Sequence, residues 1–419
     1  METWLELLRR HYNYALGQRF DWLRRTRCQI DRCSIVSESI GDIPEQFPSY
    51  NFLSGQLKQT KELFPAYKEI HADVQQQNVR RMDKTWDRWI KPDKSGKRSG
   101  RPRYKKKGEM RSFTFPRINC PKAGVNKIEN QVLTLSKIGS MPVIMHRALP
   151  EGFTTQTATI IKKPDGWYVA IALEDDSVPS TGPIDEIKSA IGVDLGLKSF
   201  LATSDGQFVA VQQHYRRTQS HLGRQQKRLA RKKQGSKNSD RQQNKVARIH
   251  QRIARKRENF HYNVAHWLVK NYDLICLENL NIKGLARTPL AKSIYDVAWG
   301  KFLTILSAVA LRCGVDFVKV SPHNTTVDCS SCQARVPKTL SVRLHSCHKC
   351  GIELDRDENA AINILNKGLN AVGLTVSACG GQGVAQPMKQ ECPVAMLGSH
   401  HRVSGGGCHN NRKFNLYIS

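Results

Sequence analysis

Two pairs of cysteines place the tightest constraint on how this chain folds. Cys329 and Cys332 form one Cys-x2-Cys pair, Cys347 and Cys350 form a second, and fourteen residues separate the two pairs. This spacing is typical of a zinc ribbon, in which each pair supplies two thiolates to one tetrahedral ion. Because cysteine fills all four ligand positions, we expect Zn²⁺ to have a structural role here.

The positive charge of the chain is concentrated in two stretches. The 419 residues carry a formal net charge of +30. Residues 216–257 contain sixteen Lys and Arg with one acid, and residues 94–117 contain ten with one acid. A single basic run is most often a solvated face. Two dense runs beside a zinc ribbon instead favour surfaces that bind a polyanion such as nucleic acid.

The remaining cysteines do not indicate disulfides. The chain holds twelve cysteines, no secretory signal follows Met1, and no apolar run approaches the ~20 residues of a membrane span. We therefore expect a soluble protein of the prokaryotic cytoplasm, associated with the nucleoid, and no membrane partner. The cysteines interpreted as free thiols are Cys28, Cys33, Cys120, Cys276 and Cys313. Cys379, Cys392, Cys408 and His400-His401 lack the spacing of a metal site.

The first 110 residues divide into a helical part and a linker. Val74, Val79, Met82, Trp86 and Trp89 fall at helical spacing, which favours the core of a helix bundle over a platform for stacking bases. The Gly- and Pro-interrupted basic stretch that follows predicts a linker that is flexible without a polyanion.

Strands and a cationic hairpin follow. Alternating apolar residues from Ser112 onward predict a small β domain, with a hairpin turn at Lys163-Pro164-Asp165-Gly166. Within the basic stretch, Leu222 and Val246 belong to a thin apolar seam, so we expect a helical hairpin with cationic outer faces and a further helix near 260–270.

Three acids are candidates for catalysis. Asp194 and Glu278 each end an apolar, strand-like run, and Asp357 follows the last cysteine closely. A single buried acid is most often a cap or an ion-pair partner, because an unpaired ionised carboxylate there costs several kcal/mol. Three such acids on one edge of an RNase H-like sheet would require divalent ions. Their hard oxygen ligands suit Mg²⁺ or Mn²⁺, and two such ions can hydrolyse a phosphodiester bond.

Five motifs in order resemble the TnpB proteins of insertion sequences, which are RNA-guided DNA endonucleases long described as transposases and related to type V CRISPR effectors. The resemblance spans roughly residues 95–370. The motifs are Gly192-Val193-Asp194-Leu195-Gly196, Leu277-Glu278-Asn279-Leu280, Cys329-Ser330-Ser331-Cys332, Cys347-His348-Lys349-Cys350-Gly351 and Asp355-Arg356-Asp357-Glu358-Asn359-Ala360-Ala361.

The resemblance implies a multidomain α+β architecture, in which a RuvC-like α/β nuclease domain carries an inserted zinc ribbon. The implied parts are a helical recognition domain (1–92), a basic linker (93–110), a wedge-like β-barrel (111–180), the RuvC-like domain (185–325) with its basic hairpin (216–257), the zinc ribbon (326–354), a last RuvC helix (355–372) and a disordered tail (373–419). Family members usually begin with a strand that completes the wedge barrel, whereas this chain begins in the first recognition helix.

The resemblance also assigns roles to residues. Asp194, Glu278 and Asp357 become the Mg²⁺-binding catalytic acids, with Asp355 as a neighbouring structural acid. The four cysteines become Zn²⁺ ligands, whereas His345 and His348 are expected to be exposed or to face phosphate. Guide RNA from the transposon end and target double-stranded DNA are the implied partners. Their expected contacts are Arg101, Arg103, Lys105, Arg224, Lys227, Arg228, Arg231, Lys232, Arg248, Arg252 and Arg255.

Two alternatives to the endonuclease stay open. An RNase H-fold transposase would also catalyse strand transfer, and would yield joined products as well as cut ones. A nonenzymatic nucleic-acid-binding protein would be favoured by a missing acid, but all three acids are present.

Overall fold

The chain forms two compact units. The computed structural model describes residues 1–27, 46–93, 96–145, 154–174, 187–339, 341–373 and 414–418. The first unit comprises Met1–Asp176 with His400–Ser419, and the second comprises Ser177–Ser399. Cys28, Cys33 and most of the predicted tail lie outside the described residues.

The first unit begins with helices, as the sequence predicts. The bounds are α1 (Glu2–Arg27), α2 (Tyr50–Gly55), α3 (Leu57–Leu63), the 3₁₀ helix η1 (Pro65–Glu69) and α4 (Ala72–Ile90). The predicted stripe on α4 is core: Val74, Val79, Met82 and Trp86 are buried, and Trp89 packs against them. Their partners include Leu8 and Leu16 of α1.

The described part of the basic linker makes hydrogen bonds to these helices. The backbone N–H of Lys105 donates to Asn13 Oδ1 at 2.8 Å, and Asn13 Nδ2 and Arg9 Nη1 both donate to the Lys105 carbonyl at 2.9 Å. The Ser99 N–H donates to the Arg88 carbonyl at 2.8 Å. These partners are far away in sequence, so composition alone did not reveal them.

A seven-stranded sheet completes the first unit. Its strands are β1 (Ser112–Phe115), β2 (Lys127–Glu129), β3 (Val132–Leu135), β4 (Gly139–Ile144), β5 (Thr154–Lys163), β6 (Gly166–Glu174) and β14 (Phe414–Ile418), with the 3₁₀ helix η2 (Pro121–Ala123) before β2. The order is β1-β5-β6-β14-β4-β3-β2. Lys163 pairs with Gly166, which confirms the predicted hairpin turn.

Strand β14 corrects the expectation of a disordered tail for five of its residues. It pairs in parallel with β6 and with β4. Its sequence, Phe-Asn-Leu-Tyr-Ile, consists largely of residues that favour strands, and the gap between β6 and β4 offers backbone partners on both sides.

The second unit is built on a five-stranded mixed sheet. Its strands are β7 (Ala190–Asp194), β8 (Ser199–Thr203), β9 (Phe208–Ala210), β10 (Leu274–Glu278) and β11 (Asp316–Val320). The order is β11-β10-β7-β8-β9; β7, β10 and β11 run in parallel, and β8 runs antiparallel to both of its neighbours, β7 and β9. A two-stranded sheet of β12 (Leu344–Ser346) and β13 (Glu353–Asp355) lies in the cysteine-rich region.

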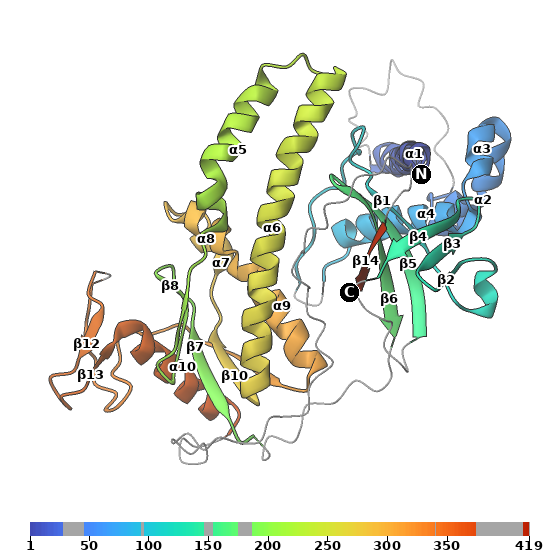
Figure 1. Ribbon diagram of the computed structural model, residues 1–419. Helices are drawn as coiled ribbons and strands as arrows, with labels where there is room; N and C mark the ends of the chain where they lie inside the picture. Colours follow the sequence, from blue (N-terminus) through green and yellow to red (C-terminus); the bar gives the residue numbers. More distant parts are fainter. Residues whose placement is uncertain are drawn as a thin grey trace, which may run out of the picture. The chain divides into compact units, whose positions relative to one another are not determined.

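Helices cover both faces of this sheet (Figure 1). The helices of the second unit are α5 (His214–Ala230), α6 (Lys237–Asn271), α7 (Ile282–Leu285), α8 (Ala291–Val297), α9 (Trp299–Arg312) and α10 (Arg356–Ala371). One face packs on α6 and α9, and the other packs on α10.

The basic stretch forms the predicted helical hairpin, in which α5 and α6 lie side by side (Figure 1). Leu222, Val246 and Ile253 of the seam are buried. The separate helix expected near 260–270 is instead the last part of the 35-residue helix α6. The apolar residues of this last part of α6 pack against the sheet, and the helix reaches it without a break.

One apolar stretch of the second unit is longer than predicted from the sequence. Ala291–Arg312 has the length and composition of a membrane-crossing helix, although half of its apolar window is buried within the protein. Ala298 has a φ of +52° and separates the stretch into α8 and α9. Phe302, Leu306 and Val309 pack in the core, which accounts for the apolar composition.

Candidate active site and metal centre

Two of the predicted acids end adjacent strands. Asp194 is the last residue of β7 and Glu278 is the last residue of β10. The two strands run in parallel, and Val193 is paired with Leu277, so the next residues on each strand are the two acids. Carboxyl ends of parallel strands share one edge of a sheet, where ligand sites are common in α/β proteins.

Strand alternation sends both acids toward the same helix. Ile275 and Leu277 belong to the core shared with α6 and α9, whereas Leu274 and Cys276 belong to the core shared with α10. Because successive side chains on a strand point to opposite faces, Glu278 lies on the α10 face. Ile191 and Val193 place Asp194 on that face by the same rule.

Close packing brings α10 onto these strands. A Cβ at Gly192 would lie 2.0 Å from the Ala361 carbonyl oxygen, and a Cβ at Gly368 would lie 2.1 Å from Cys276 Sγ. Only glycine permits both approaches, one against β7 and one against β10. Since Ala361 is one helical turn beyond Asp357, the Gly192 contact also sets how near Asp357 comes to Asp194.

The start of α10 holds the third acid. Asp355 is the N-cap of α10, and its Oδ1 accepts from the Asp357 N–H at 2.8 Å, so Asp355 has the structural role expected of it. Asp357 is buried and has two cations beside it: Arg356 Nη2 lies 3.2 Å and Arg343 Nη1 3.6 Å from its Oδ1. A Cβ at Gly196, just past β7, would lie 4.0 Å from Asp357 Oδ2.

The charges of the other two acids act on Asp194. Burial, together with the charges of Glu278 and Asp357, raises the pKa of Asp194 to about 7. Burial also raises the pKa of Glu278, and a hydrogen bond from Thr325 opposes that shift. Like charges brought together in a partly buried site disfavour the ionised forms. This arrangement is one that a divalent cation would stabilise.

The four cysteines form a site of the right size for zinc. In the part of the chain that the structure describes, theirs is the one group of metal-ligating side chains whose ligand atoms all lie within 4.8 Å of one another. The Sγ atoms of Cys329 and Cys350 lie 3.6 Å apart, as do those of Cys332 and Cys347. Tetrahedral Zn–S bonds of ~2.3 Å require sulfurs ~3.8 Å apart. Backbone N–H groups of Cys350 and Lys349 help lower the pKa of Cys347 to about 6, which favours the ligating thiolate.

His345 differs from its predicted environment. It is fully buried and its Nδ1 contacts Lys338 Nζ, so it is neither exposed nor facing phosphate. Leu344 and Ser346, its neighbours on β12, are exposed, which is the alternation of a strand with one covered face. His348 is exposed, as expected.

The predicted nucleic-acid contacts lie in both units. On the hairpin, Arg255 is half-buried and the others are exposed: Arg224, Lys227, Arg228, Arg231, Lys232, Arg248 and Arg252. In the linker, Arg103 is exposed. Arg101 lies over the Phe20 ring at 4.4 Å and Lys105 lies over Tyr12 at 4.9 Å, so these two cations already stack on aromatic rings.

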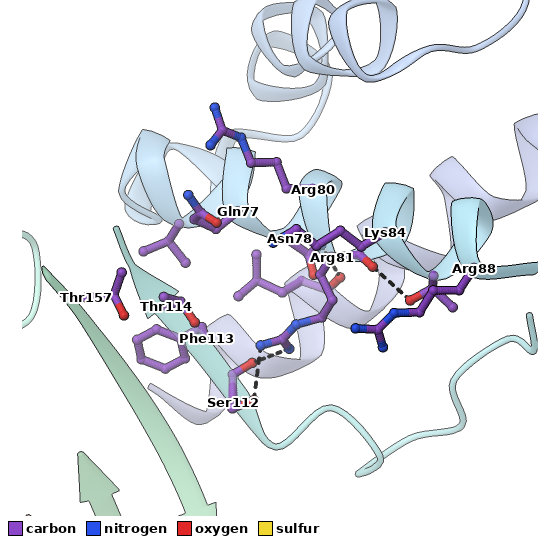
Figure 2. A pocket seen from close by; sticks show the side chains of 13 residues that line it. Gln77, Asn78, Arg80, Arg81, Lys84, Arg88, Ser112, Phe113, Thr114 and Thr157 are labelled. Carbon is purple, nitrogen blue, oxygen red and sulfur yellow. Dashed lines mark hydrogen bonds between the residues drawn. The ribbon is translucent and has the colours of Figure 1, made fainter. Parts of the chain in front are cut away.

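A cationic cavity in the first unit was missed from sequence. It has a volume of about 410 Å³ between α4 and the edge strand β1 (Figure 2). Arg80, Lys84 and Arg88 are exposed on one face of α4 and line it together with Arg81. The other lining residues are Leu8, Val74, Gln77, Asn78, Thr85, Ser112, Phe113, Thr114 and Thr157, none of them acidic. The sequence does carry a signal for this face: Arg80, Lys84 and Arg88 are four residues apart, which puts them on the side of α4 opposite its apolar stripe.

Comparison with known proteins gives two family matches within the chain. A family described as "Probable transposase" matches residues 172–288, and one described as "Cas12f1-like, TNB domain" matches residues 299–364. The first range contains Asp194 and Glu278. The second contains the four cysteines and Asp357.

Similar proteins are known from several organisms. The chain is 32% identical over 292 residues to a "Putative RNA-guided DNA endonuclease" of Streptomyces pristinaespiralis, covering 68% of each chain. It is 27% identical over 341 residues to the "Putative RNA-guided DNA endonuclease InsQ" of Escherichia coli (strain K12), covering 77% of this chain and 79% of that one. "TnpB-like protein L79" of Acanthamoeba polyphaga mimivirus is 31% identical over 131 residues, which is 30% of this chain and 25% of that one.

A solved structure also aligns with most of the chain. It is described as "Cryo-EM structure of the Cas12f1-sgRNA-target DNA complex" and covers 87% of this chain and 82% of that one, with a TM-score of 0.48 and 13% identity. Those values are too low to establish a shared fold. The sequence relationship is decisive: with 32% identity over two thirds of both chains, this chain belongs to the TnpB family.

Proposed function

We propose that this protein is an RNA-guided DNA endonuclease of a mobile element, and that Asp194, Glu278 and Asp357 form its catalytic site. The observation that carries the proposal is the position of the three acids. Two end adjacent parallel strands on the face covered by α10, and the third lies in the first turn of α10. The names of the Streptomyces and Escherichia coli relatives support RNA guidance and DNA as the substrate.

The donor set fits Mg²⁺ or Mn²⁺. Asp194, Glu278 and Asp357 offer hard carboxylate oxygens. The pKa of Asp194 is raised by burial and then by the charges of Glu278 and Asp357, and a divalent cation would neutralise that charge. Bound there, two such ions would supply the Lewis acidity needed for phosphodiester hydrolysis. The three acids would hold and orient the ions. Arg356 and Arg343, beside Asp357, are placed to meet a phosphate of the substrate.

The finer architecture follows from the same proposal. The five-stranded sheet of the second unit would be the RuvC-like domain, because a five-stranded sheet in which one strand, here β8, runs opposite to the other four is typical of RNase H-like folds. The region 326–354 would be its inserted zinc ribbon. In the first unit, the seven-stranded sheet would be the wedge-like β-barrel, and the helices within 1–92 would be the recognition domain.

Two surfaces suit the nucleic-acid partners. The exposed cations of the α5–α6 hairpin can follow the backbone of a guide–target duplex, where base pairing supplies the sequence specificity. The α4 cavity combines cations with amide and hydroxyl groups that could meet phosphates or base edges. The expected partners are guide RNA from the transposon end and target double-stranded DNA.

The direct test is cleavage by protein copurified with its RNA. The bound RNA is sequenced, a matching DNA duplex is added with Mg²⁺, and the wild type is compared with Asp194→Ala and Asp316→Asn. Asp316 is a matched control because it lies on the same sheet at the start of β11, the edge opposite the acids. We expect cleavage by the wild type and the control, and loss of cleavage in Asp194→Ala.

Each other outcome decides against the proposal. Cleavage that survives Asp194→Ala would exclude the acid site, and joined products would favour a transposase that catalyses strand transfer. Binding of the matched duplex without any cleavage would favour a nonenzymatic nucleic-acid-binding protein.

A further inference from the structure

Two buried asparagines connect α10 to the first cysteine pair. Asn359 and Asn363 lie one turn apart on α10 and are 0% and 4% exposed. Both Nδ2 atoms donate to the carbonyl oxygen of Asp328, at 2.9 and 2.7 Å, and Asn359 Oδ1 accepts from the Ser330 N–H at 2.9 Å. The backbone on both sides of Cys329 is therefore attached to the helix that carries Asp357.

The same network reaches a second acid. Asn363 Nδ2 also donates to the Thr325 carbonyl at 2.9 Å. The Thr325 hydroxyl, on a residue 2% exposed, donates to Glu278 Oε1 at 2.5 Å. The Pro322 carbonyl, at 3.2 Å, is the more distant alternative for the same proton. Hydrogen bonds thus lead from the residues on both sides of Cys329, through the two asparagines and Thr325, to the carboxylate of Glu278.

The backbone between these points is a tight turn. The N–H groups of Val327 and Asp328 both donate to the Asn324 carbonyl, at 3.1 and 3.0 Å. Thr325 therefore cannot move far independently of Cys329. A shift of the cysteine pair would be passed to Thr325, and from there to Glu278.

Asparagines that donate to buried carbonyl groups are ordinary structural features, so the two asparagines by themselves do not indicate a functional role. The observation that indicates such a role is the hydrogen bond from Thr325 to Glu278. A carboxylate that accepts a hydrogen bond on one oxygen has its orientation set and keeps the other oxygen for a metal ion. Removing such a hydrogen-bonding partner typically lowers metal affinity by about 10- to 100-fold. The Thr325 hydroxyl is such a hydrogen-bonding partner of Glu278.

We infer that the cysteine pair Cys329–Cys332, held by zinc, orients Glu278 for divalent-ion binding, with Thr325, Asn359 and Asn363 as positioning residues. The inference rests on the proposed function, because it takes Glu278 to be an ion ligand. It gives the zinc ribbon a role in the catalytic site in addition to any contact with nucleic acid.

The test measures Mn²⁺ binding to the full-length, zinc-loaded protein by electron paramagnetic resonance, with no substrate present. Thr325→Val removes the hydroxyl at nearly constant shape, and Thr325→Ser keeps it. We expect Thr325→Val to weaken Mn²⁺ binding by roughly tenfold or more, and Thr325→Ser to restore most of the wild-type affinity. Thr304→Val is the control, since the hydroxyl of Thr304 is exposed and donates within α9.

A second measurement follows the other end of the network. Asn359→Ala should both weaken Mn²⁺ binding and speed the release of Zn²⁺ to a chelator, because it detaches the backbone on both sides of Cys329. Faster Zn²⁺ release with unchanged Mn²⁺ binding would overturn the inference and leave Asn359 a purely structural residue.

The outcomes also separate this inference from the proposed function. Wild-type Mn²⁺ affinity in Thr325→Val, or equal losses in the Val and Ser variants, would overturn the inference while Asp194→Ala still abolished binding. If Asp194→Ala kept full Mn²⁺ affinity, the acid site itself would be wrong. Should Thr325→Val fail to fold, the Asn359→Ala measurement decides.

Discussion

At the scale of single residues, Asp194 is the acid whose environment least favours its ionised form. Its carboxylate ends a buried strand beside two other acids, and its pKa rises from an ordinary 3.8 to about 7. Folding therefore places a negative charge where it is unfavourable. Such a residue is retained when binding or catalysis needs it, and pKa values displaced in this way cluster at functional sites.

This displacement predicts a pH dependence of stability. Between about pH 4 and pH 7, folded Asp194 holds a proton that the unfolded chain has released, so its contribution to the free energy of unfolding falls as the pH rises. In buffer free of Mg²⁺ and Mn²⁺, Asp194→Asn should gain stability over the wild type as the pH is raised across this range. Urea unfolding at several pH values measures the difference.

Added Mg²⁺ should act in the opposite sense. It should stabilise the wild type more above pH 7 than at pH 5, because protons compete with the ion for the carboxylate at the lower pH. If the difference in the free energy of unfolding between the wild type and Asp194→Asn stays constant with pH, this result would contradict the raised pKa of Asp194.

At the scale of elements, the packing of α10 on β7 and β10 decides whether the acids meet. Gly192→Ala places a methyl group 2.0 Å from the Ala361 carbonyl, so α10 must move away from β7. We expect a loss of roughly 1–3 kcal/mol in the free energy of unfolding, typical of overpacking, together with reduced cleavage as Asp357 moves from Asp194. Urea unfolding and cleavage assays on the same preparation measure both effects.

Gly223→Ala is the matched control for this substitution. Gly223 lies in α5, and a Cβ there would meet nothing within 4 Å. Because alanine favours helix over glycine, the control should be neutral or slightly stabilising. Equal effects of the two substitutions would exclude the close approach of α10 as the cause.

The α5–α6 hairpin makes a separate prediction about charge. Replacing Arg224, Arg228 and Arg252 by Ala should weaken RNA binding and flatten its dependence on salt. Each lost phosphate contact should reduce the slope of log K against log salt concentration by about 0.7 to 0.9. Replacement of the same three residues by Lys keeps the charge and should keep the slope. An unchanged slope in the Ala variant would show that the RNA phosphates do not contact these three residues.

At the scale of the whole molecule, the zinc ribbon should fold only with its ion. Few apolar side chains are buried in 326–354, so the Zn–thiolate bonds supply most of its stability. Complete removal of Zn²⁺ should abolish hydrogen-exchange protection in this region. The seven-stranded sheet of the first unit has its own core and should keep its protection. Unchanged circular dichroism and activity without zinc would contradict the four-thiolate site.

Several features were predictable from the sequence because they depend on neighbours along the chain. The spacing of the cysteine pairs, the apolar stripe of α4 and the turn at Pro164-Asp165 each lie within one short segment of the chain. Asp357 was favoured over Asp355 by the resemblance, because the family's acid stands two residues before Asn-Ala-Ala. Local spacing is sufficient where one element or one short loop carries the whole signal.

Other features depended on contacts between distant residues. The burial of His345, the docking of the basic linker on α1 and the pairing of β14 with β6 each require a partner that local pattern does not name. The cations of the α4 cavity were overlooked because the apolar stripe on the same helix gave the stronger signal.

The sequence by itself determined which groups are available: four thiolates at zinc spacing, three acids beside apolar runs and two dense stretches of positive charge. Only the tertiary structure decided how those groups meet. Parallel pairing of β7 with β10 and the close approach of α10 at Gly192 bring the acids to one edge. Thr325, Asn359 and Asn363 join that edge to the cysteines. The physical reason is that strand pairing and buried hydrogen bonds are satisfied by partners in space, and the order of residues along the chain does not specify those partners.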